Sequence, residues 1–369
     1  CCGKAQAGLM QLYNPYRVKA PMKRTNPQKG MGVDPGWVEI TWDEALNTVA
    51  ARLKKVYDDD PRKFAFTTCF GSLPTYIGLG TLILGPDLPL GLAGAFKTPN
   101  VFAWGPGDMC GGGLHFAPAR YTGSMVTYPD LPLCNYYINF GGPFCGYGKG
   151  SPNNTEPMNR ARERGMKFVV FDPVSSTDAR VADEWIPVKP VTSQAVALAM
   201  ANVLVHELGL YDEWSLKNRS NGAYLIGPDG FYVRSKTKIN AHPDPIWNEK
   251  LGEPLVWDAR ANEAKGFKDK SLGDPALEGT YTVDGVQCQP AFQKLKDFLK
   301  QYTPEWAEGI STVPASTIRR IAKEYGEAAQ IGAWTTIDGV KMPYRPVAVA
   351  YGKGSQGHTH ASIIARSFE

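Results

Sequence analysis

The sequence has no long apolar run and little excess charge. Its best apolar stretch, 195–205, is interrupted by Asn202 and is too short, because a helix that crosses a bilayer needs roughly 18–20 apolar residues. A net charge of only +4 on 369 residues gives no compositional case for nucleic acid as a partner. The 43% hydrophobic and 21% charged residues are ordinary globular usage, which excludes disorder as the dominant state.

Common metal and disulfide patterns are missing as well. The seven cysteines include no C-x-x-C pair, and the five histidines form no H-E-x-x-H motif, so a zinc site is disfavoured. An odd number of cysteines in a chain of this length also argues against a disulfide framework. The sequence shows no internal repeats.

Glycine (39 residues) and proline (29) are plentiful, which indicates long loops between regular elements. Residues 85–125 consist almost entirely of loop signals, and loops this long inside a domain are usually functional. The length predicts two or three domains. A chain that opens on Cys-Cys and ends inside a helical pattern is expected to be a piece of a longer polypeptide.

The clearest structural unit covers residues 136–172. A strand (136–140) leads into a glycine-rich turn (141–150) and then a helix that ends at Gly165. A second strand follows and ends at Asp172. This order predicts a right-handed βαβ unit in a parallel sheet, and the fold class is therefore α/β.

Patterns elsewhere predict further elements. Residues 185–190 form a short strand before a helix at 193–208, with Thr192 or Ser193 as its N-cap. Thr41 and Glu44 form a capping box at the start of another helix. Residues 1–40 are expected to be ordered irregular chain, and 215–287 show only turn signals. Strands are also predicted at 63–70 and 332–337, and helices at 291–302 and 314–329.

Two groups of residues suggest chemistry. Glycines near 141–150 would let backbone N–H groups approach a phosphate, and Asp172 stands where an acidic residue commonly binds a ribose hydroxyl. Because the pattern is not G-x-G-x-x-G, nucleotide binding and a plain structural turn remain equally good interpretations. Cys110 lies on a glycine-rich loop, where a thiolate suits a soft metal or, with His115, a nucleophile; an exposed loop cysteine is the third alternative.

The other cysteines are interpreted differently. Cys2 is consistent with a free terminus, a lipidated end or one ligand of a cluster. Four further cysteines are expected to be structural: Cys69, Cys134, Cys145 and Cys288.

Several spaced stretches resemble the molybdopterin oxidoreductase family, whose members include enzymes similar to dimethyl sulfoxide reductase, formate dehydrogenase and polysulfide reductase. CGKAQAGLMQLYNPYRVKAPMKR, from Cys2 on, is similar to the segment that follows the family's cluster motif, with Ala5 in place of glycine. WVEITWDEAL (37–46) and KTPNVFAWGPGDMC, ending at Cys110, resemble the next two family segments.

The middle and end of the chain extend the resemblance. KFVVFDPVSSTDARVADEWIPVKPVTSQAVALAMANVL resembles the family's dinucleotide-binding signature, but the family's Gly-Thr-Asp is Val191-Thr192-Ser193 here. The stretch YGKGSQGHTHASIIARSF, which contains His358, is similar to a later family segment. The insertion at 215–287 most suggests the branch of phenylacetyl-CoA:acceptor and thiosulfate- or polysulfide-type enzymes.

The resemblance implies an enzyme with two pterin guanine dinucleotides (bis-molybdopterin guanine dinucleotide) on one molybdenum or tungsten, and a [4Fe–4S] cluster. It implies Cys110 as metal ligand, Cys2 as cluster ligand and Lys4 between cluster and pterin. It implies His115 as a further catalytic candidate. The cofactor-binding positions that it implies are Gly141, Gly142, Asp172, Ser193 and His358.

The resemblance also implies an arrangement of Rossmann-like domains with long loops around the pterin. The expected division is 1–62 for part of the iron–sulfur domain, 63–210 for the dinucleotide-binding domain, 211–290 for an irregular insertion and 291–369 for part of a second α/β domain, without the family's C-terminal domain. The expected partners are a small-molecule substrate, an iron–sulfur electron-transfer subunit, plus a membrane anchor subunit, in a periplasmic or cytoplasmic membrane-associated complex. Two alternatives stay open: a non-catalytic electron-wiring or structural relative, and a simple NAD-binding dehydrogenase.

Overall fold

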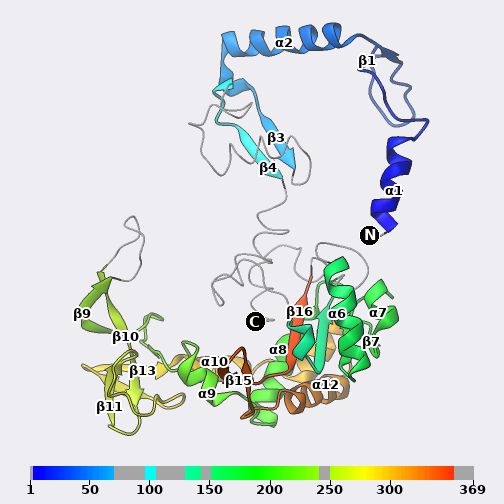
Figure 1. Ribbon diagram of the computed structural model, residues 1–369. Helices are drawn as coiled ribbons and strands as arrows, with labels where there is room; N and C mark the ends of the chain where they lie inside the picture. Colours follow the sequence, from blue (N-terminus) through cyan, green and yellow to red (C-terminus); the bar gives the residue numbers. More distant parts are fainter. Residues whose placement is uncertain (1–2, 70–95, 105–128, 143–150, 241–249, 353–369) are drawn as a thin grey trace. The chain divides into compact units, whose positions relative to one another are not determined.

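The computed structural model describes residues 3–69, 96–104, 129–142, 151–240 and 250–352 (Figure 1). The chain divides into two compact units, Cys1–Gly112 and Gly113–Glu369, which are described separately below. In the parts that the structure describes, no helix is long and apolar enough to cross a membrane.

The first unit contains more regular structure at its start than the sequence predicts. Its elements are α1 (Gly3–Leu12), β1 (Met22–Arg24), β2 (Trp37–Glu39), α2 (Trp42–Asp59), β3 (Phe66–Cys69) and β4 (Val101–Trp104). The expectation of irregular chain over 1–40 is therefore wrong, since α1 and the antiparallel pair β1–β2 lie there. Neither strand of that pair exceeds 3 residues, which is too short to leave a periodic pattern.

The predicted cap of α2 is confirmed. Thr41 Oγ1 accepts a hydrogen bond from the backbone N–H of Glu44 at 3.1 Å, which satisfies one of the free donors at the helix start. Strand β3 pairs in parallel with β4, so the strand predicted within 63–70 is also present.

The second unit is built on one parallel sheet. The sheet and its helices comprise β5 (Tyr136–Phe140), α6 (Ser151–Glu163), β6 (Lys167–Phe171), α7 (Thr177–Val181), β7 (Glu184–Ile186), α8 (Ser193–Asn202), α11 (Pro304–Ser311), α12 (Ala315–Ala328) and β16 (Val347–Tyr351). The strand order is β16-β5-β6-β7 and every pairing is parallel, which confirms the βαβ prediction. Gly165 ends the α6 region with a φ of 97°, a value that favours glycine.

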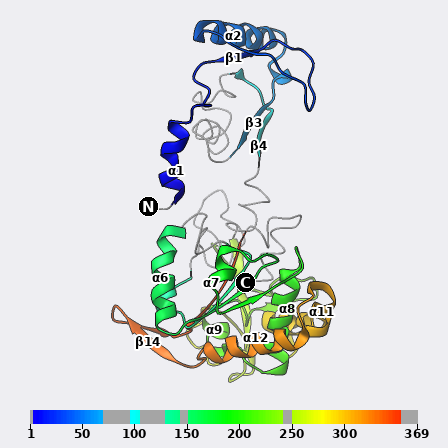
Figure 2. The same cartoon turned by 90° about the vertical axis from the view of Figure 1, so that its right-hand side faces the viewer.

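Helices cover both faces of this sheet (Figure 2). Ile138 of β5 and Phe171 of β6 pack with α8, α11 and α12, whereas Phe168 of β6 and Met158 of α6 pack on the opposite face with α7. Successive side chains of a strand point to opposite faces of the sheet, so neighbouring residues pack in different halves of the core. A strand that is buried on both faces therefore appears in the sequence as a continuous apolar run. The core of the second unit therefore fixes the strands from both sides.

The final strand of the sheet comes from far along the chain. β16 lies in the range 291–369, for which the sequence predicts a second α/β domain, yet it pairs with β5 of the range 63–210. The sequence predicts no strand at 347–351, and local patterns give no sign of a partner more than 200 residues away. The predicted domain boundaries stay predictions.

The range predicted as an irregular insertion contains antiparallel strands. It holds α9 (Glu213–Asn218), β8 (Leu225–Ile226), β9 (Arg234–Asn240), β10 (Lys250–Asp258), β11 (Glu263–Gly266), β12 (Tyr281–Val283) and β13 (Val286–Pro290). Asp258, which is 1% exposed, accepts hydrogen bonds from the Lys265 ammonium at 2.9 Å and from the backbone N–H of Gly273 at 2.9 Å. These donors hold the pKa of Asp258 well below its ordinary value. Through the same hydrogen bonds, this buried carboxylate links segments of the chain that show no periodic sequence pattern.

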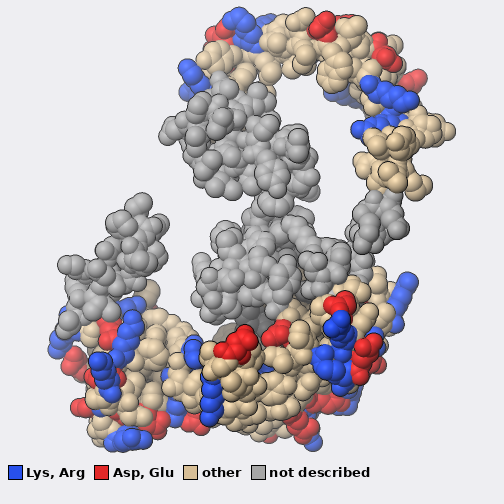
Figure 3. Space-filling view, in the orientation of Figure 1, with Lys and Arg blue, Asp and Glu red and all other residues tan. Residues whose placement is uncertain are grey.

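Three further elements lie in the second unit. They are α10 (Ala291–Leu299), β14 (Trp334–Ile337) and β15 (Val340–Pro343). The helices expected at 291–302 and 314–329 and the strand at 332–337 are thus present, whereas α11 is an element that the pattern did not indicate. Acidic and basic side chains lie interspersed over the described surface in Figure 3.

Candidate functional site

The four strands of the parallel sheet end in register. Tyr351 lies beside Phe140, Phe140 beside Phe171, and Phe171 beside Ile186. The residues that follow therefore leave the sheet at one common edge, called the carboxyl edge below. Ligands of open parallel α/β sheets bind at this edge, so we place the candidate site here.

A tight turn leaves the end of β5. Gly141 has a φ of 61°, and its N–H donates to the carbonyl oxygen of Phe171 at 3.0 Å. The side chain of Asn139 holds Gly142 from both sides: its Oδ1 accepts from the Gly142 N–H at 3.1 Å, and its Nδ2 donates to the Gly142 carbonyl at 2.5 Å. Both glycine N–H groups thus already donate within the protein.

Buried polar groups support this turn from below. Asn139 Nδ2 also donates to Asp178 Oδ2 at 3.0 Å, and the two residues are 0% and 1% exposed. Asp178 lies on α7, whose N-cap Ser176 accepts from the Ala179 N–H. A buried amide that bonds to both a carboxylate and a backbone turn restricts the turn to one geometry.

The turn after β5 touches the loop after β16. Gly352 donates its N–H to the carbonyl oxygen of Phe140 at 3.1 Å. A Cβ atom built on Gly352 would lie 2.3 Å from the Cα of Gly142 and 2.9 Å from the carbonyl oxygen of Gly141. Only glycine fits such an approach of two backbones.

Asp172 follows β6 and is held at three points. Its N–H donates to the carbonyl of Ile186 at 3.3 Å, its Oδ1 accepts from the Val174 N–H at 3.0 Å, and its carbonyl accepts from the indole N–H of Trp185 at 2.8 Å. The residue is 9% exposed. Its second carboxylate oxygen takes no hydrogen bond from the described part of the chain, so it can accept one from a ligand.

Helix α8 begins after β7 with Ser193, which is 6% exposed. Thr192 occupies the N-cap position, as one of the two predicted alternatives, but its hydroxyl donates to the Lys189 carbonyl at 2.6 Å instead of capping the helix. Val191 has a φ of 67°, in the left-handed region that suits glycine and disfavours a β-branched residue.

The structure brings only some of the predicted site residues together. Gly141, Gly142 and Asp172 meet at the carboxyl edge, and Lys4 lies within α1 of the first unit. Ser193 begins α8, after β7. The other four candidates lie outside the described residues: Cys2, Cys110, His115 and His358.

Two cysteines predicted to be structural are confirmed as buried. Cys134 is 3% exposed and Cys288 is 2% exposed, and both are free thiols. Burial raises the pKa of the Cys134 thiol to about 11, so this group is protonated and unreactive at neutral pH. Cys69 and Cys145 stay predictions.

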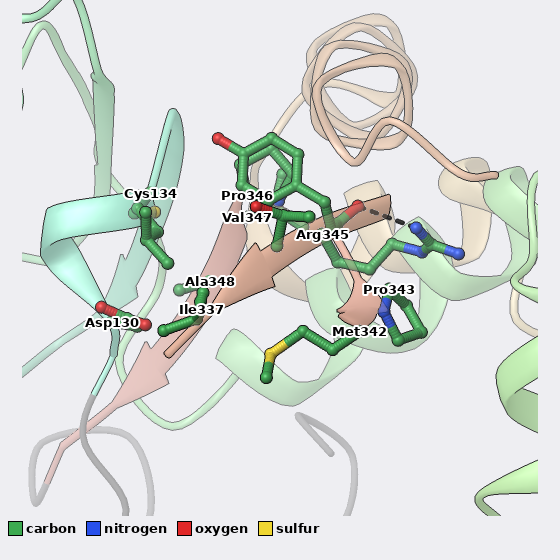
Figure 4. Close-up of a pocket in the computed structure, with 12 residues that line it drawn as sticks. Asp130, Cys134, Ile337, Met342, Pro343, Arg345, Pro346, Val347 and Ala348 are labelled. Carbon is green, nitrogen blue, oxygen red and sulfur yellow. Dashed lines mark hydrogen bonds between the residues drawn. The ribbon is translucent and has the colours of Figure 1, made fainter. Parts of the chain in front are cut away.

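A small cavity lies at the opposite, amino edge of the sheet (Figure 4). Its volume is about 180 Å³, and its lining includes Cys134, Met342 and Pro346. Arg345 on the same wall donates to the carbonyl of Tyr344 at 2.7 Å. Because the cavity precedes β5 and β16, it is separate from the carboxyl edge.

Sequence reasoning missed three residues that shape the candidate site. Asn139 lies inside an apolar strand pattern, and Asp178 and Trp185 lie in segments that the pattern assigns only to secondary structure. The one available signal was the polar Asn139 in the run YYINF, since a buried amide needs partners.

Comparison with known proteins places these observations in a family. The molybdopterin oxidoreductase family profile matches residues 17–79 and 149–369. A sulfite dehydrogenase subunit from Allochromatium vinosum is 31% identical over 345 residues, which cover 89% of this chain and 32% of that protein. The alpha subunit of the perchlorate reductase of Dechloromonas aromatica is 24% identical over an alignment of 400 residues. That alignment covers 99% of this chain and 39% of that protein.

A solved structure agrees in fold. Acetylene hydratase from Pelobacter acetylenicus superposes with a TM-score of 0.56 at 17% identity, covering 100% of this chain and 36% of that one. The chain thus spans about a third of the length of the relatives it matches. With a matching profile over most of its residues and a parallel α/β sheet of the same fold, the chain belongs to the molybdopterin oxidoreductase family.

Proposed function

We propose that this chain is part of the catalytic subunit of a molybdenum- or tungsten-dependent oxidoreductase that carries bis-molybdopterin guanine dinucleotide. The carboxyl edge, where Gly142, Asp172 and Gly352 meet, is the observation that carries the proposal. Family membership supports it, since the curated relatives are named as subunits of dehydrogenases and reductases. The proposed reaction is a two-electron oxidation or reduction of a small substrate.

The described residues fit the nucleotide end of such a cofactor. The turn at Gly141–Gly142 and the neighbouring Gly352 pack backbone against backbone, so no side chain from these three glycines stands between the carboxyl edge and a ligand. Asp172 keeps one carboxylate oxygen for a hydroxyl or N–H donor. Because both turn amides already donate, a phosphate contact there would share their hydrogens.

Each site residue then has a proposed role. Asp172 accepts from ribose, the glycine turn lies against phosphate, and Ser193 and His358 contact other parts of the dinucleotide. Ser193 is neutral where the family has aspartate, so it would offer a hydroxyl in place of a carboxylate. When bound, the cofactor supplies the redox-active metal held by sulfur.

The proposed electron path uses the first unit. Cys110 is the proposed metal ligand, because soft thiolate ligation suits this kind of metal. Cys2 is the proposed ligand of a [4Fe–4S] cluster, Lys4 lies between cluster and pterin, and His115 is a further candidate near the metal. An iron–sulfur electron-transfer subunit is the proposed partner, since relatives such as thiosulfate reductase and dimethylsulfide dehydrogenase are named as subunits.

Elemental and nucleotide analysis of the intact polypeptide tests the proposal. We expect about one molybdenum or tungsten per polypeptide, release of guanine nucleotide on acid treatment, and an iron–sulfur EPR signal after reduction. A protein with neither metal nor released nucleotide would contradict the cofactor assignment, and bound NAD in their place would favour the dehydrogenase alternative.

Replacement of Cys110 tests the proposed ligand directly. Cys110→Ala should abolish turnover and keep the iron–sulfur EPR signal, whereas Cys134→Ala is the matched control because Cys134 is buried beside the opposite edge of the sheet. Turnover that survives Cys110→Ala would refute its assignment as metal ligand.

A further inference from the structure

Trp185 stands out among the residues around the carboxyl edge. It lies in the short strand β7, in register beside Val170 of β6, and is 40% exposed although tryptophan is usually largely buried. Its indole N–H donates to the backbone carbonyl of Asp172 at 2.8 Å. The one polar atom of this side chain is therefore committed to the residue that carries the candidate carboxylate.

This bond completes the fixation of Asp172. The Ile186 carbonyl holds its N–H, the Val174 N–H holds Oδ1, and Trp185 holds its carbonyl. In the first two bonds the partner of Asp172 is a backbone group, the carbonyl of Ile186 and the N–H of Val174. Of the three bonds, the one from Trp185 is made by the side chain of another residue, so a side-chain substitution can remove it without altering Asp172 itself.

We propose that Trp185 is a positioning residue that aims the carboxylate of Asp172 at a hydroxyl-bearing nucleotide. This inference rests on the proposed function. A bond to the carbonyl restrains rotation of the peptide after Asp172. That rotation would move the Val174 N–H away from Oδ1 and so release the carboxylate from its present direction. The ligand class is one that donates from a hydroxyl or N–H group, because the remaining carboxylate oxygen is an acceptor.

The test compares variants of the intact polypeptide, expressed with limiting cofactor and purified as folded monodisperse protein. Trp185→Phe keeps an aromatic ring and loses the N–H donor. We expect it to lower acid-released guanine nucleotide per polypeptide about three- to tenfold, the size expected for loss of one well-formed hydrogen bond. Trp334→Phe is the matched control, since Trp334 is 43% exposed and lies on β14, and it should leave nucleotide content unchanged.

A double-mutant cycle separates positioning from general packing. In an Asp172→Ala background, a positioning role predicts that Trp185→Phe lowers nucleotide content no further. An equal additional loss in that background would overturn the proposal, as would a single Trp185→Phe variant with wild-type nucleotide content. If Trp185→Phe does not fold, Trp185→His replaces it in the test, because histidine retains a ring N–H. Wild-type nucleotide content in Trp185→His supports the proposal, and folded Trp185→His protein without nucleotide overturns it.

The wild-type measurement distinguishes the two levels of failure. Wild-type protein that releases no guanine nucleotide contradicts the proposed function itself. Wild-type protein that releases nucleotide together with an unaffected Trp185→Phe variant contradicts only the role of Trp185.

Discussion

A side chain on Gly352 would occupy the space of Gly142: its Cβ would lie 2.3 Å from the Gly142 Cα. Two loops that follow adjacent parallel strands are thus in direct backbone contact. Because β16 and β5 are far apart in the sequence, this contact joins distant parts of the chain at the candidate site.

Gly352→Ala should therefore separate these two loops. We expect it to lower the free energy of unfolding by about 1–3 kcal/mol, the usual cost of overpacking, and to reduce nucleotide content. Gly309→Ala is the control, because no atom lies within 4 Å of a Cβ at that position of α11 and helical Gly→Ala changes are favourable. Urea unfolding of the intact polypeptide measures both variants; an unaffected Gly352→Ala would show that the loops can move apart freely.

Asn139→Ala should loosen the turn after β5. It removes the side-chain bonds to Gly142 and one donor to Asp178, all in a buried environment. We expect a loss of about 2–4 kcal/mol in the free energy of unfolding. Asn218→Ala removes a single exposed hydrogen bond, from Asn218 to the Trp214 carbonyl, and should lower the free energy of unfolding by only about 0.5 kcal/mol. Equal denaturation midpoints for the two variants would contradict the role given to Asn139.

Val191→Gly should stabilise the protein. Val191 has a φ of 67°, and relief of left-handed strain at a β-branched residue is worth about 1–2 kcal/mol, of which glycine's unfolded-state entropy offsets about half. The net gain should raise the thermal midpoint. Val286→Gly is the control: Val286 is 41% exposed against 44% for Val191, lies in strand β13, and should lower the midpoint. A lower midpoint for Val191→Gly would mean that its side chain packs more tightly than its exposure indicates.

Glu324 should make stability depend on acidity. Burial raises its pKa, but hydrogen bonds from Lys167, Tyr136 and Arg320 outweigh this and lower the pKa below the ordinary 4.5. The folded state therefore binds fewer protons than the unfolded state. The stabilisation is present above pH 4.5 and is lost as the pH falls below that value.

Glu324→Gln should accordingly lose about 1–2 kcal/mol at neutral pH and show a shallower decline in acid. Glu327→Gln, on the same helix and 60% exposed, is the control and should retain the wild-type acid profile. Chemical denaturation at several pH values gives the comparison. Parallel profiles for wild type and Glu324→Gln would assign the acid sensitivity to other carboxylates.

Local elements were predictable because their signals are local. Thr41 and Glu44 indicate a helix start, and the apolar runs at 136–140 and 167–171 with an intervening helix indicate a βαβ unit. The positions of Gly141 and Asp172 at one edge follow from that unit alone. These are the parts of the candidate site that topology determines.

The rest depends on contacts that no local pattern records. Nothing near Gly352 indicates that β16 pairs with β5, and nothing near Trp185 indicates a bond to Asp172. Asn139 resembles one more strand residue until its buried partners are seen. Tertiary packing, and not propensity, selects these arrangements.

The in-register ends of the four strands have a consequence for biosynthesis. One wall of the carboxyl edge is built by Gly352, so the edge is incomplete while the ribosome has delivered only β5, β6 and β7. Closing a chain separation of more than 200 residues is entropically costly and slow compared with pairing of β5 and β6. Under the proposed function, a preformed cofactor would therefore meet a complete binding edge only after translation has passed β16.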